Sequence, residues 1–311
     1  MKILVTGGAG FIGSHVVDAY IEAGHQVVVV DDLSSGSHAN LHPAATFYEL
    51  DIRQPELRDI FAAERPDVVN HHAAQIDVRR SVTEPAFDAE VNVLGSINLL
   101  ECARISGVGK VIYISSGGAI YGEPEYEPCD EAHPVRPLSP YGVSKYTVEQ
   151  YLPIYRAAYG LDTTALRYAN VYGPRQDPHG EAGVVAIFSA QMLAGEAPTV
   201  NGSGEQARDF VYVADCARAN VLALDRGSGR AYNLGTGTAT SINELAALLK
   251  EAAGYAGPVA HGPAKAGEVF RITLDAGRAR EELGWEPEVD LAEGLQRTVG
   301  YFREKGDADL R

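Results

Sequence analysis

Two side chains in one short segment, residues 139–145, have types and a spacing that could move a proton. The segment reads Ser-Pro-Tyr-Gly-Val-Ser-Lys. Ser139 is a suitable helix N-cap, and Pro140 fits the first helical position. We therefore expect Tyr141 in the first turn of a helix, with Lys145 one turn later on the same face. A phenol has a pKa of about 10, but a nearby ammonium group and the positive end of a helix favour its ionised form. The spacing predicts that Tyr141 is a general acid–base and that Lys145 lowers its pKa, although this spacing is also common on ordinary helix surfaces.

A glycine-rich turn close to the N-terminus could hold the phosphates of a dinucleotide. Residues 6–13 read Thr-Gly-Gly-Ala-Gly-Phe-Ile-Gly, between a strand-like run and a helix-like run. Two glycine registers fit, because the pattern can begin at Gly7 or at Gly8. Either register lets the backbone approach a pyrophosphate at a helix N-terminus. The residues of this turn that we predict to contact the dinucleotide are Gly7, Gly10, Phe11, Ile12 and Gly13.

Acidic residues at the end of the next predicted strand favour NAD over NADP. Asp31 and Asp32 end an apolar run, where a carboxylate accepts hydrogen bonds from both ribose hydroxyls and repels a 2′-phosphate. Asp31 is the preferred candidate, and Asp32 could instead be an ordinary turn residue. Asp51 and Ile52 are placed to meet the adenine, and a helix cap is the competing interpretation of Asp51. A bound nicotinamide cation would further favour the Tyr141 phenolate.

Strand-like and helix-like segments alternate through the first half of the chain. We expect buried strands at 3–6, 27–31, 46–50, 68–70, 111–115 and 163–168. We expect helices at 11–23, 55–64, 84–106 and 140–159. This alternation predicts an α/β fold with a doubly wound parallel sheet of the Rossmann type. The ends of its strands would position both the glycine turn and the helix of Tyr141.

The composition changes after about residue 170, where segments rich in Gly and Pro such as 172–183 and 201–205 become frequent. Helices are predicted at 184–194, 213–224, 241–253, 276–283 and 290–304. We therefore predict an NAD-binding domain over 1–169 and a smaller, loop-rich substrate lobe over 170–311. The chain is expected to re-enter the first domain near 231–236.

The charge and the cysteine content exclude several other classes of protein. The 311 residues contain 42 Asp and Glu against 26 Lys and Arg, a net charge of −16. That balance disfavours nucleic acid and anionic lipid as partners. The three cysteines are irregularly spaced, and His71, His72 and His179 lack the spacing of paired ligands, so we expect no disulfide framework and no metal site. No secretory signal or membrane-length apolar run is evident, and we expect a cytoplasmic protein.

Several motifs together resemble the extended short-chain dehydrogenase/reductase family and, within it, the UDP-glucose (UDP-galactose) 4-epimerases. The resemblance covers nearly the whole chain. The matching segments are 6–13, 72–75, 115–122, 139–145, 166–174, 180–188, 208–213 and 233–237. The resemblance implies that bound NAD⁺ takes a hydride from C4 of the sugar while Tyr141 takes the O4 proton. The 4-ketosugar then turns, and the hydride returns to its opposite face.

The resemblance also assigns roles to individual residues. Lys145 would bind the nicotinamide ribose, and Asn170 would contact the sugar diphosphate. Arg208 would hold a phosphate, and an ion pair with Asp209 or Glu205 is the competing interpretation. Further cofactor contacts are implied for Ser115, Asn92, His72, Ala73, Ala74, Gln75 and Tyr168, the last of these beside the nicotinamide. Further substrate contacts are implied for Tyr141, Ser116, Gly117, Val184, Thr199, Val200, Asn201 and Glu268.

The chain departs from the family pattern where a catalytic hydroxyl is expected. The family has Ser or Thr four residues before the tyrosine of a Ser/Thr-x-x-x-Tyr-Gly segment. Here that tyrosine is Tyr121, and the position holds Gly117. We expect Ser116 to supply the hydroxyl, with Ser115 as the alternative. The lack of a carboxylate after this position disfavours the 4,6-dehydratases of the family. Residues 265–268 (Lys-Ala-Gly-Glu) replace the family's Arg-x-Gly-Asp, which changes its phosphate and ribose contacts.

Three functions remain open on the sequence. The first is C4 epimerisation of UDP-galactose and UDP-glucose. The second is C4 epimerisation of UDP-glucuronate or a UDP-N-acetylhexosamine, because Ile272, near the family's size-gating position, does not decide between sugars. The third is an NAD-sensing binding protein on the same fold, which the retained Tyr141 and Lys145 disfavour. The long helices of this family pair across a dimer, so we expect a homodimer.

Overall fold

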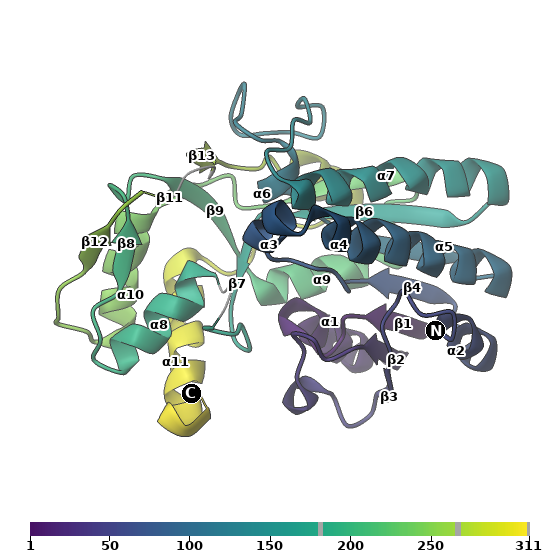
Figure 1. Cartoon of the computed structure of the whole chain (residues 1–311), viewed down its shortest axis with the longest axis horizontal. Coiled ribbons are helices and arrows are strands. Elements are labelled where there is room, and N and C mark those ends of the chain that lie inside the picture. Colours follow the sequence, from purple (N-terminus) through teal and green to yellow (C-terminus); the bar gives the residue numbers. More distant parts are fainter. Residues whose placement is uncertain (180–182, 265–268, 310–311) are drawn as a thin grey trace.

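A seven-stranded parallel sheet forms the larger part of the protein (Figure 1). The computed structural model describes residues 1–179, 183–264 and 269–309. The strand order is β10-β6-β5-β4-β1-β2-β3, and all neighbours are parallel. The strands are β1 Lys2–Thr6, β2 Gln26–Asp31, β3 Thr46–Glu49, β4 Val68–His71, β5 Lys110–Ser116, β6 Asp162–Tyr168 and β10 Arg230–Leu234. The predicted α/β doubly wound fold is confirmed. The strand order reverses between β1 and β4, and sheets of this kind bind nucleotides at that point.

Helices cover both faces of this sheet, which is why its strands are apolar on both sides (Figure 1). The helices α1 and α9 pack on one face, while α2, α5 and α7 pack on the other. Within β5, Ile114 joins the α1 and α9 core, whereas Tyr113 joins the α7 core. The helices named here are α1 Phe11–Glu22, α2 Leu57–Glu64, α5 Gly95–Ser106, α7 Pro140–Tyr159 and α9 Val213–Ala223, with a short 3₁₀ turn η1 at His38–Asn40.

The single helix predicted over 84–106 is divided in the structure. After α3 (Val78–Thr83), the short helix α4 (Pro85–Ala89) leads into a π-helical turn, η2 (Glu90–Leu94), before α5 begins. The apolar pattern does not reveal this turn, because one extra residue in a long helix barely alters the periodicity. The wider turn aims Asn92 at the backbone of Gln75, where it makes two hydrogen bonds of 2.9 Å.

Smaller sheets and helices make up the second lobe, on the left of Figure 1. Its strands are β7 Asn170–Tyr172, β8 Thr199–Asn201, β9 Ala207–Tyr212, β11 Ala239–Ser241, β12 Ala260–Gly262 and β13 Arg271–Ile272. Its helices are α8 Val184–Leu193, α10 Ile242–Ala253 and α11 Leu291–Asp309, with a π-helical turn η3 at Ala279–Leu283 that contacts α9 and β10 of the large domain. Most of these strands have two or three residues, too few to show the alternation that predicts a strand. In the part of the chain that is described, no helix is long and apolar enough to cross a membrane.

Candidate active site

The glycine turn packs tightly between β1, α1 and the segment after β4. Gly7 has a φ of +70°, and a Cβ atom there would lie 2.6 Å from the Ala73 nitrogen. At Gly13 a Cβ atom would lie 2.1 Å from the Gly7 carbonyl oxygen. Gly10 is the N-cap of α1 and brings no side chain over the first amides of the helix. The turn therefore presents backbone N–H groups at a helix N-terminus, which suits a pyrophosphate.

Asp31 is fixed beside this turn, whereas the other two predicted acids are not. Its carboxylate accepts hydrogen bonds of 2.9 Å from the Ala9 and Leu33 amides, and burial raises its pKa. Asp32 is exposed and closes a local turn by accepting from Ser34. The structure thus favours Asp31 as the ribose acceptor.

Asp51 lies in a turn before α2. It pairs with Arg53, whose guanidinium lowers the pKa of the carboxyl group, and it accepts from the Arg53 amide at 2.8 Å. The N-cap of α2 is Glu56, so the alternative interpretation of Asp51 as a helix cap is wrong. The adjacent Ile52 is 4% exposed, and its carbonyl accepts from Asn98.

The segment 72–75 lies next to the glycine turn and continues the surface predicted to bind the dinucleotide. The Ala73 amide donates to the Thr6 carbonyl at 3.1 Å, which fixes the segment against β1. The Asn92 side chain bonds both polar groups of the Gln75 backbone. Two buried polar atoms of this region, His72 Nε2 and Ser115 Oγ, have no hydrogen-bond partner among the residues that the structure describes. Burial lowers the pKa of His72 to about 3, and the charge of Lys145 contributes to the shift. The neutral His72 ring is therefore close to Lys145.

These features fit a bound dinucleotide. The packed glycine turn leaves the helix N-terminus accessible, Asp31 closes the ribose side, and unpartnered polar atoms remain near Lys145. A nicotinamide dinucleotide supplies what such atoms lack, namely a carboxamide and ribose hydroxyls. In the described part of the chain no cluster of three potential metal ligands occurs.

The helix α7 holds Tyr141 and Lys145 as the sequence spacing predicts. Ser139 caps the helix by accepting from the Gly142 amide at 3.2 Å, and Pro140 is its first residue. The Lys145 ammonium donates to the Ile114 carbonyl at 3.0 Å and lies 5.9 Å from the centre of the Tyr141 ring. The reacting pair therefore sits over the carboxyl end of β5.

Burial opposes the lowering of the Tyr141 pKa that the sequence predicts. Burial raises the pKa of Tyr141 to about 12, and a hydrogen bond with Ser116 opposes that shift. Burial also lowers the pKa of Lys145 to about 8. Burial thus disfavours the charged form of each of the two groups. A nicotinamide cation close to Tyr141 would favour the phenolate form of Tyr141.

Ser116 lies within hydrogen-bonding reach of Tyr141, and the family's position for the hydroxyl, Gly117, has no room for a side chain. The Ser116 side chain interacts with Tyr141, whereas Ser115 Oγ has no hydrogen-bond partner within the described ranges. A Cβ atom on Gly117 would lie 2.4 Å from Leu274 Cδ1. Leu274 therefore fills the space that a serine or threonine at position 117 needs.

The predicted substrate residues lie on several elements of the second lobe. A Cβ atom on Gly118 would lie 3.5 Å from Asn170 Oδ1, so Asn170 faces the start of α6 (Gly117–Ile120) beside Ser116.

Arg208 donates to the Phe270 carbonyl at 3.2 Å. The Asp209 carboxylate is used by the amides of Thr236, Gly237 and Leu274, and Glu205 accepts from Asn243. Val184 begins α8, and Thr199, Val200 and Asn201 form β8, with Val200 buried in the lobe core. The predicted contact at Glu268 lies outside the described residues.

The structure does not bring the Tyr168 hydroxyl to the reacting pair. Tyr168 is 3% exposed and packs in the α1 and α9 core, on the face of the sheet opposite to α7. Its hydroxyl accepts a 2.5 Å hydrogen bond from Asn220. The prediction that Tyr168 lies beside the nicotinamide therefore gains no support from its side-chain contacts.

Two buried charged groups near Lys145 escaped the sequence analysis. Glu149 follows Lys145 by one turn and makes a bidentate pair with Arg167, and both side chains are at most 7% exposed. Asp88, on α4, accepts a 2.6 Å hydrogen bond from Ser144. Glu149 could have been found from the sequence, because Tyr141, Lys145 and Glu149 are spaced four residues apart and therefore share one helix face. Nothing in the local sequence marks Asp88.

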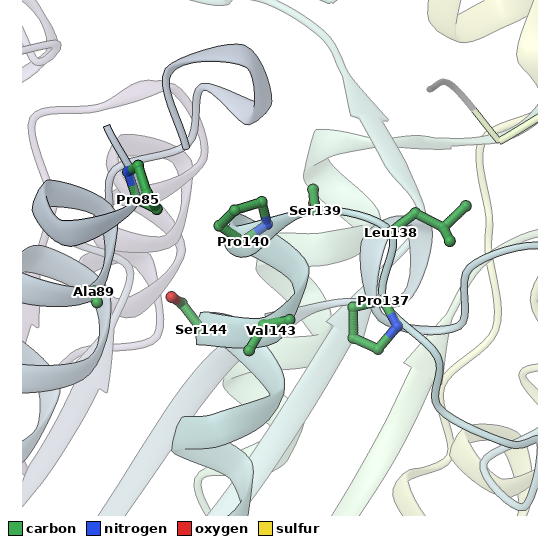
Figure 2. Close-up of a pocket in the computed structure, with 8 residues that line it drawn as sticks. All are labelled: Pro85, Ala89, Pro137, Leu138, Ser139, Pro140, Val143 and Ser144. Carbon is green, nitrogen blue, oxygen red and sulfur yellow. The ribbon is translucent and has the colours of Figure 1, made fainter. Parts of the chain in front are cut away.

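A groove of about 450 Å³ borders the start of α7 (Figure 2). It separates the helix carrying Pro85 and Ala89 from the segment that leads into α7. Its lining residues are Pro85, Ala89, Pro137, Leu138, Ser139, Pro140, Val143 and Ser144.

Comparison with known proteins gives consistent similarities. The NAD dependent epimerase/dehydratase family pattern matches residues 3–235. The UDP-glucose 4-epimerase of Mycolicibacterium smegmatis is 49% identical over 311 residues, covering 98% of this chain and 99% of that protein. A crystal structure of UDP-glucose 4-epimerase from Thermotoga maritima with UDP-glucose has a TM-score of 0.97 and 53% identity, covering 98% of this chain and 99% of that one. The Thermus thermophilus UDP-glucose 4-epimerase in complex with NAD has a TM-score of 0.93 and 45% identity, covering 97% and 99%. The similarity thus spans both lobes.

Proposed function

The chain belongs to the NAD dependent epimerase/dehydratase family, and on that premise we propose that it is an NAD-dependent UDP-glucose 4-epimerase. It inverts C4 of the hexose and so interconverts UDP-galactose and UDP-glucose through a transient 4-ketosugar. The observation that carries this assignment is the half-buried Tyr141, next to Ser116 and close to Lys145, at the strand ends beside a dinucleotide turn.

The chain's own residues move and hold the proton. When bound, NAD supplies a reversible hydride acceptor. Tyr141 Oη takes the proton of the O4 hydroxyl and later returns it, and the Ser116 hydroxyl bonds the same oxygen. Lys145 holds a positive charge beside the phenolate, which lowers the cost of forming it in a buried site.

The second lobe is proposed to hold the UDP moiety while the sugar turns. Asn170 is near the reacting groups, and Arg208 presents a guanidinium that suits bidentate phosphate binding. The net charge of −16 repels anions, so these local donors and the α1 N-terminus must hold two anionic ligands against that repulsion. The division into domains at 1–169 and 170–311 remains a proposal of the same kind. Strand β10 pairs with β6 in the large sheet, which supports the proposed return of the chain to the first domain near 231–236.

The direct test is a substrate panel read by product analysis. Purified protein is incubated with UDP-galactose, UDP-glucuronate or a UDP-N-acetylhexosamine, each without added reductant. We expect UDP-galactose to be converted to UDP-glucose at the highest kcat/KM. Conversion of only the uronate or the acetylated sugar would replace the proposed substrate, and no conversion of any sugar in the presence of NAD would reject the enzyme.

We also propose that the protein is a homodimer. The α5 and α7 side of the molecule carries exposed apolar residues, with Leu94 at 60%, Ile105 at 47%, Val143 at 51% and Ile154 at 57% exposure. Such a surface on adjacent helices is typical of a protein interface. Sedimentation should give twice the chain mass, and Ile154→Glu should reduce it to the monomer; a monomeric wild type would refute the proposal.

A cytoplasmic location is supported by the cysteines. Cys102, Cys129 and Cys216 are all free and buried, as is common in reducing compartments.

A further inference from the structure

Asp88 is a fully buried carboxylate between the catalytic helix and the cofactor segment. It is 0% exposed, and its partners are neutral donors. Its Oδ2 accepts from Ser144 at 2.6 Å, and its Oδ1 accepts from Gln75 at 2.9 Å and from Asn92 at 3.0 Å. No salt bridge within the described residues includes Asp88. A buried charge of this kind is costly and needs a compensating reason.

The hydrogen bonds of Asp88 join the two halves of the site. Ser144 directly precedes Lys145 on α7, and Figure 2 shows its hydroxyl directed from α7 toward the helix that carries Ala89. Gln75 ends the segment that packs against the glycine turn, and its backbone is bonded twice to Asn92. Asp88 is therefore an acceptor that the catalytic helix and the cofactor segment share.

The connection continues from Asn92 to the glycine turn itself. The Asn92 carbonyl accepts from Ser96 at 2.5 Å, and the Ser96 hydroxyl bonds His71 Nε2 at 2.9 Å. The other ring nitrogen of His71 bonds Thr6 Oγ1 at 2.7 Å. Thr6 precedes Gly7, so an unbroken polar chain runs from α7 to the first glycine of the dinucleotide turn.

The charge of Asp88 also reaches the reacting pair. It raises the pKa of Lys145 against the effect of burial, and it raises the pKa of Tyr141. The other groups that face Lys145 are Glu149 on the same helix, His71 and His72 at the end of β4, and Tyr113 on β5.

We propose that Asp88 is a positioning residue that holds α7 in register with the cofactor segment and supplies a fixed negative charge to the Tyr141 and Lys145 pair. The proposal rests on the proposed epimerase function, because turnover of UDP-galactose is its readout. A positional effect should appear in kcat more than in KM, because the substrate is held mainly by the other lobe.

Four variants separate position, charge and stability. Asp88→Ala removes the shared acceptor, and a displacement of about 1 Å should lower kcat about 100-fold. Asp88→Asn keeps a carbonyl oxygen for Gln75 and Asn92 and an amide for the Ser144 hydroxyl, but it removes the charge. Ser144→Ala removes one hydrogen bond and keeps the charge. Asp215→Asn is the control, because Asp215 is also buried and accepts several hydrogen bonds but lies on α9 away from the site.

The pH profile of kcat distinguishes these roles. Without the charge of Asp88, the pKa values of Lys145 and Tyr141 both fall, so both limbs of the Asp88→Asn profile should move to lower pH. Asp88→Asn should recover most of the kcat that Asp88→Ala loses. Ser144→Ala should lower kcat with the profile in place, and Asp215→Asn should lower only Tm.

A wild-type kcat and an unshifted profile for Asp88→Asn and Ser144→Ala would overturn the proposal, and so would a loss confined to Tm. If Asp88→Ala does not fold, those two variants still decide the matter. Failure of the epimerase assignment is a different outcome, because then the wild-type protein itself leaves UDP-galactose unchanged.

Discussion

Restoring the family's hydroxyl at position 117 should damage this protein. In Gly117→Ser the new Cβ atom would lie 2.4 Å from Leu274 Cδ1, 3.0 Å from Cδ2 and 3.3 Å from Cγ. Ordinary carbon–carbon contacts are about 3.5–4.0 Å. Leu274 cannot easily withdraw, because it is 1% exposed and its amide donates to Asp209 at 3.1 Å. Overpacking of this kind costs about 1–3 kcal/mol, so we expect Gly117→Ser to lower the free energy of unfolding by that amount.

The companion change is Leu274→Ala, which removes all three clashing atoms. Alone it should cost about 2–5 kcal/mol, because it leaves a cavity. Combined with Gly117→Ser it should cost less than the sum, with a coupling of about 1–2 kcal/mol between the two sites. Urea unfolding of the four proteins measures the cycle, and turnover of UDP-galactose should not rise in Gly117→Ser, since Ser116 already bonds Tyr141. Full additivity, or a Gly117→Ser protein as stable as wild type, would refute the reasoning.

Three further predictions follow from buried charges. Lys145→Met should abolish turnover yet raise the free energy of unfolding by up to about 3 kcal/mol at pH 7, because the pKa of Lys145 is lowered to about 8 in the folded protein. This gain in stability should fade as the pH rises from 8 toward the pKa of lysine in the unfolded chain. Urea unfolding at several pH values would detect or exclude it. Breaking the buried pair with Arg167→Met should lower stability by about 3–5 kcal/mol, more than the Arg80→Met control at an exposed pair, and equal losses would count against a role for burial. Asp31→Ala should weaken NAD retention by about 1.5–3 kcal/mol, measured as bound NAD after gel filtration, while Asp32→Ala should leave it unchanged; the reverse order would exchange their roles.

Local signals in the sequence were sufficient for the parts of the site that depend on neighbouring residues. Ser139 and Pro140 determine where α7 begins, and the four-residue spacing then places Tyr141 and Lys145 on one face. The glycine turn and Asp31 follow in the same way from a strand, a turn and a helix. The parallel sheet follows from apolar strands that alternate with helices.

Properties that depend on distant contacts were not predictable. Leu274 is far from Gly117 along the chain, and only the assembled lobes bring them together. Burial by the assembled fold raises the pKa of Tyr141, and the spacing of residues along the chain does not report that burial. Asp88 looks like an ordinary polar residue of a helix until the π-helical turn brings Asn92 and Gln75 to it.

The central claim is that Tyr141 transfers the proton in C4 epimerisation on a protein-bound NAD, and Tyr141→Phe tests it most directly. The variant keeps the ring and the glycine turn, so the amount of NAD bound per chain should equal that of the wild type. Its kcat for conversion of UDP-galactose to UDP-glucose should fall by a factor of about 10²–10⁴, since only the acid–base group is lost. A Tyr141→Phe protein that binds NAD and turns over UDP-galactose at a near-normal rate would contradict the account.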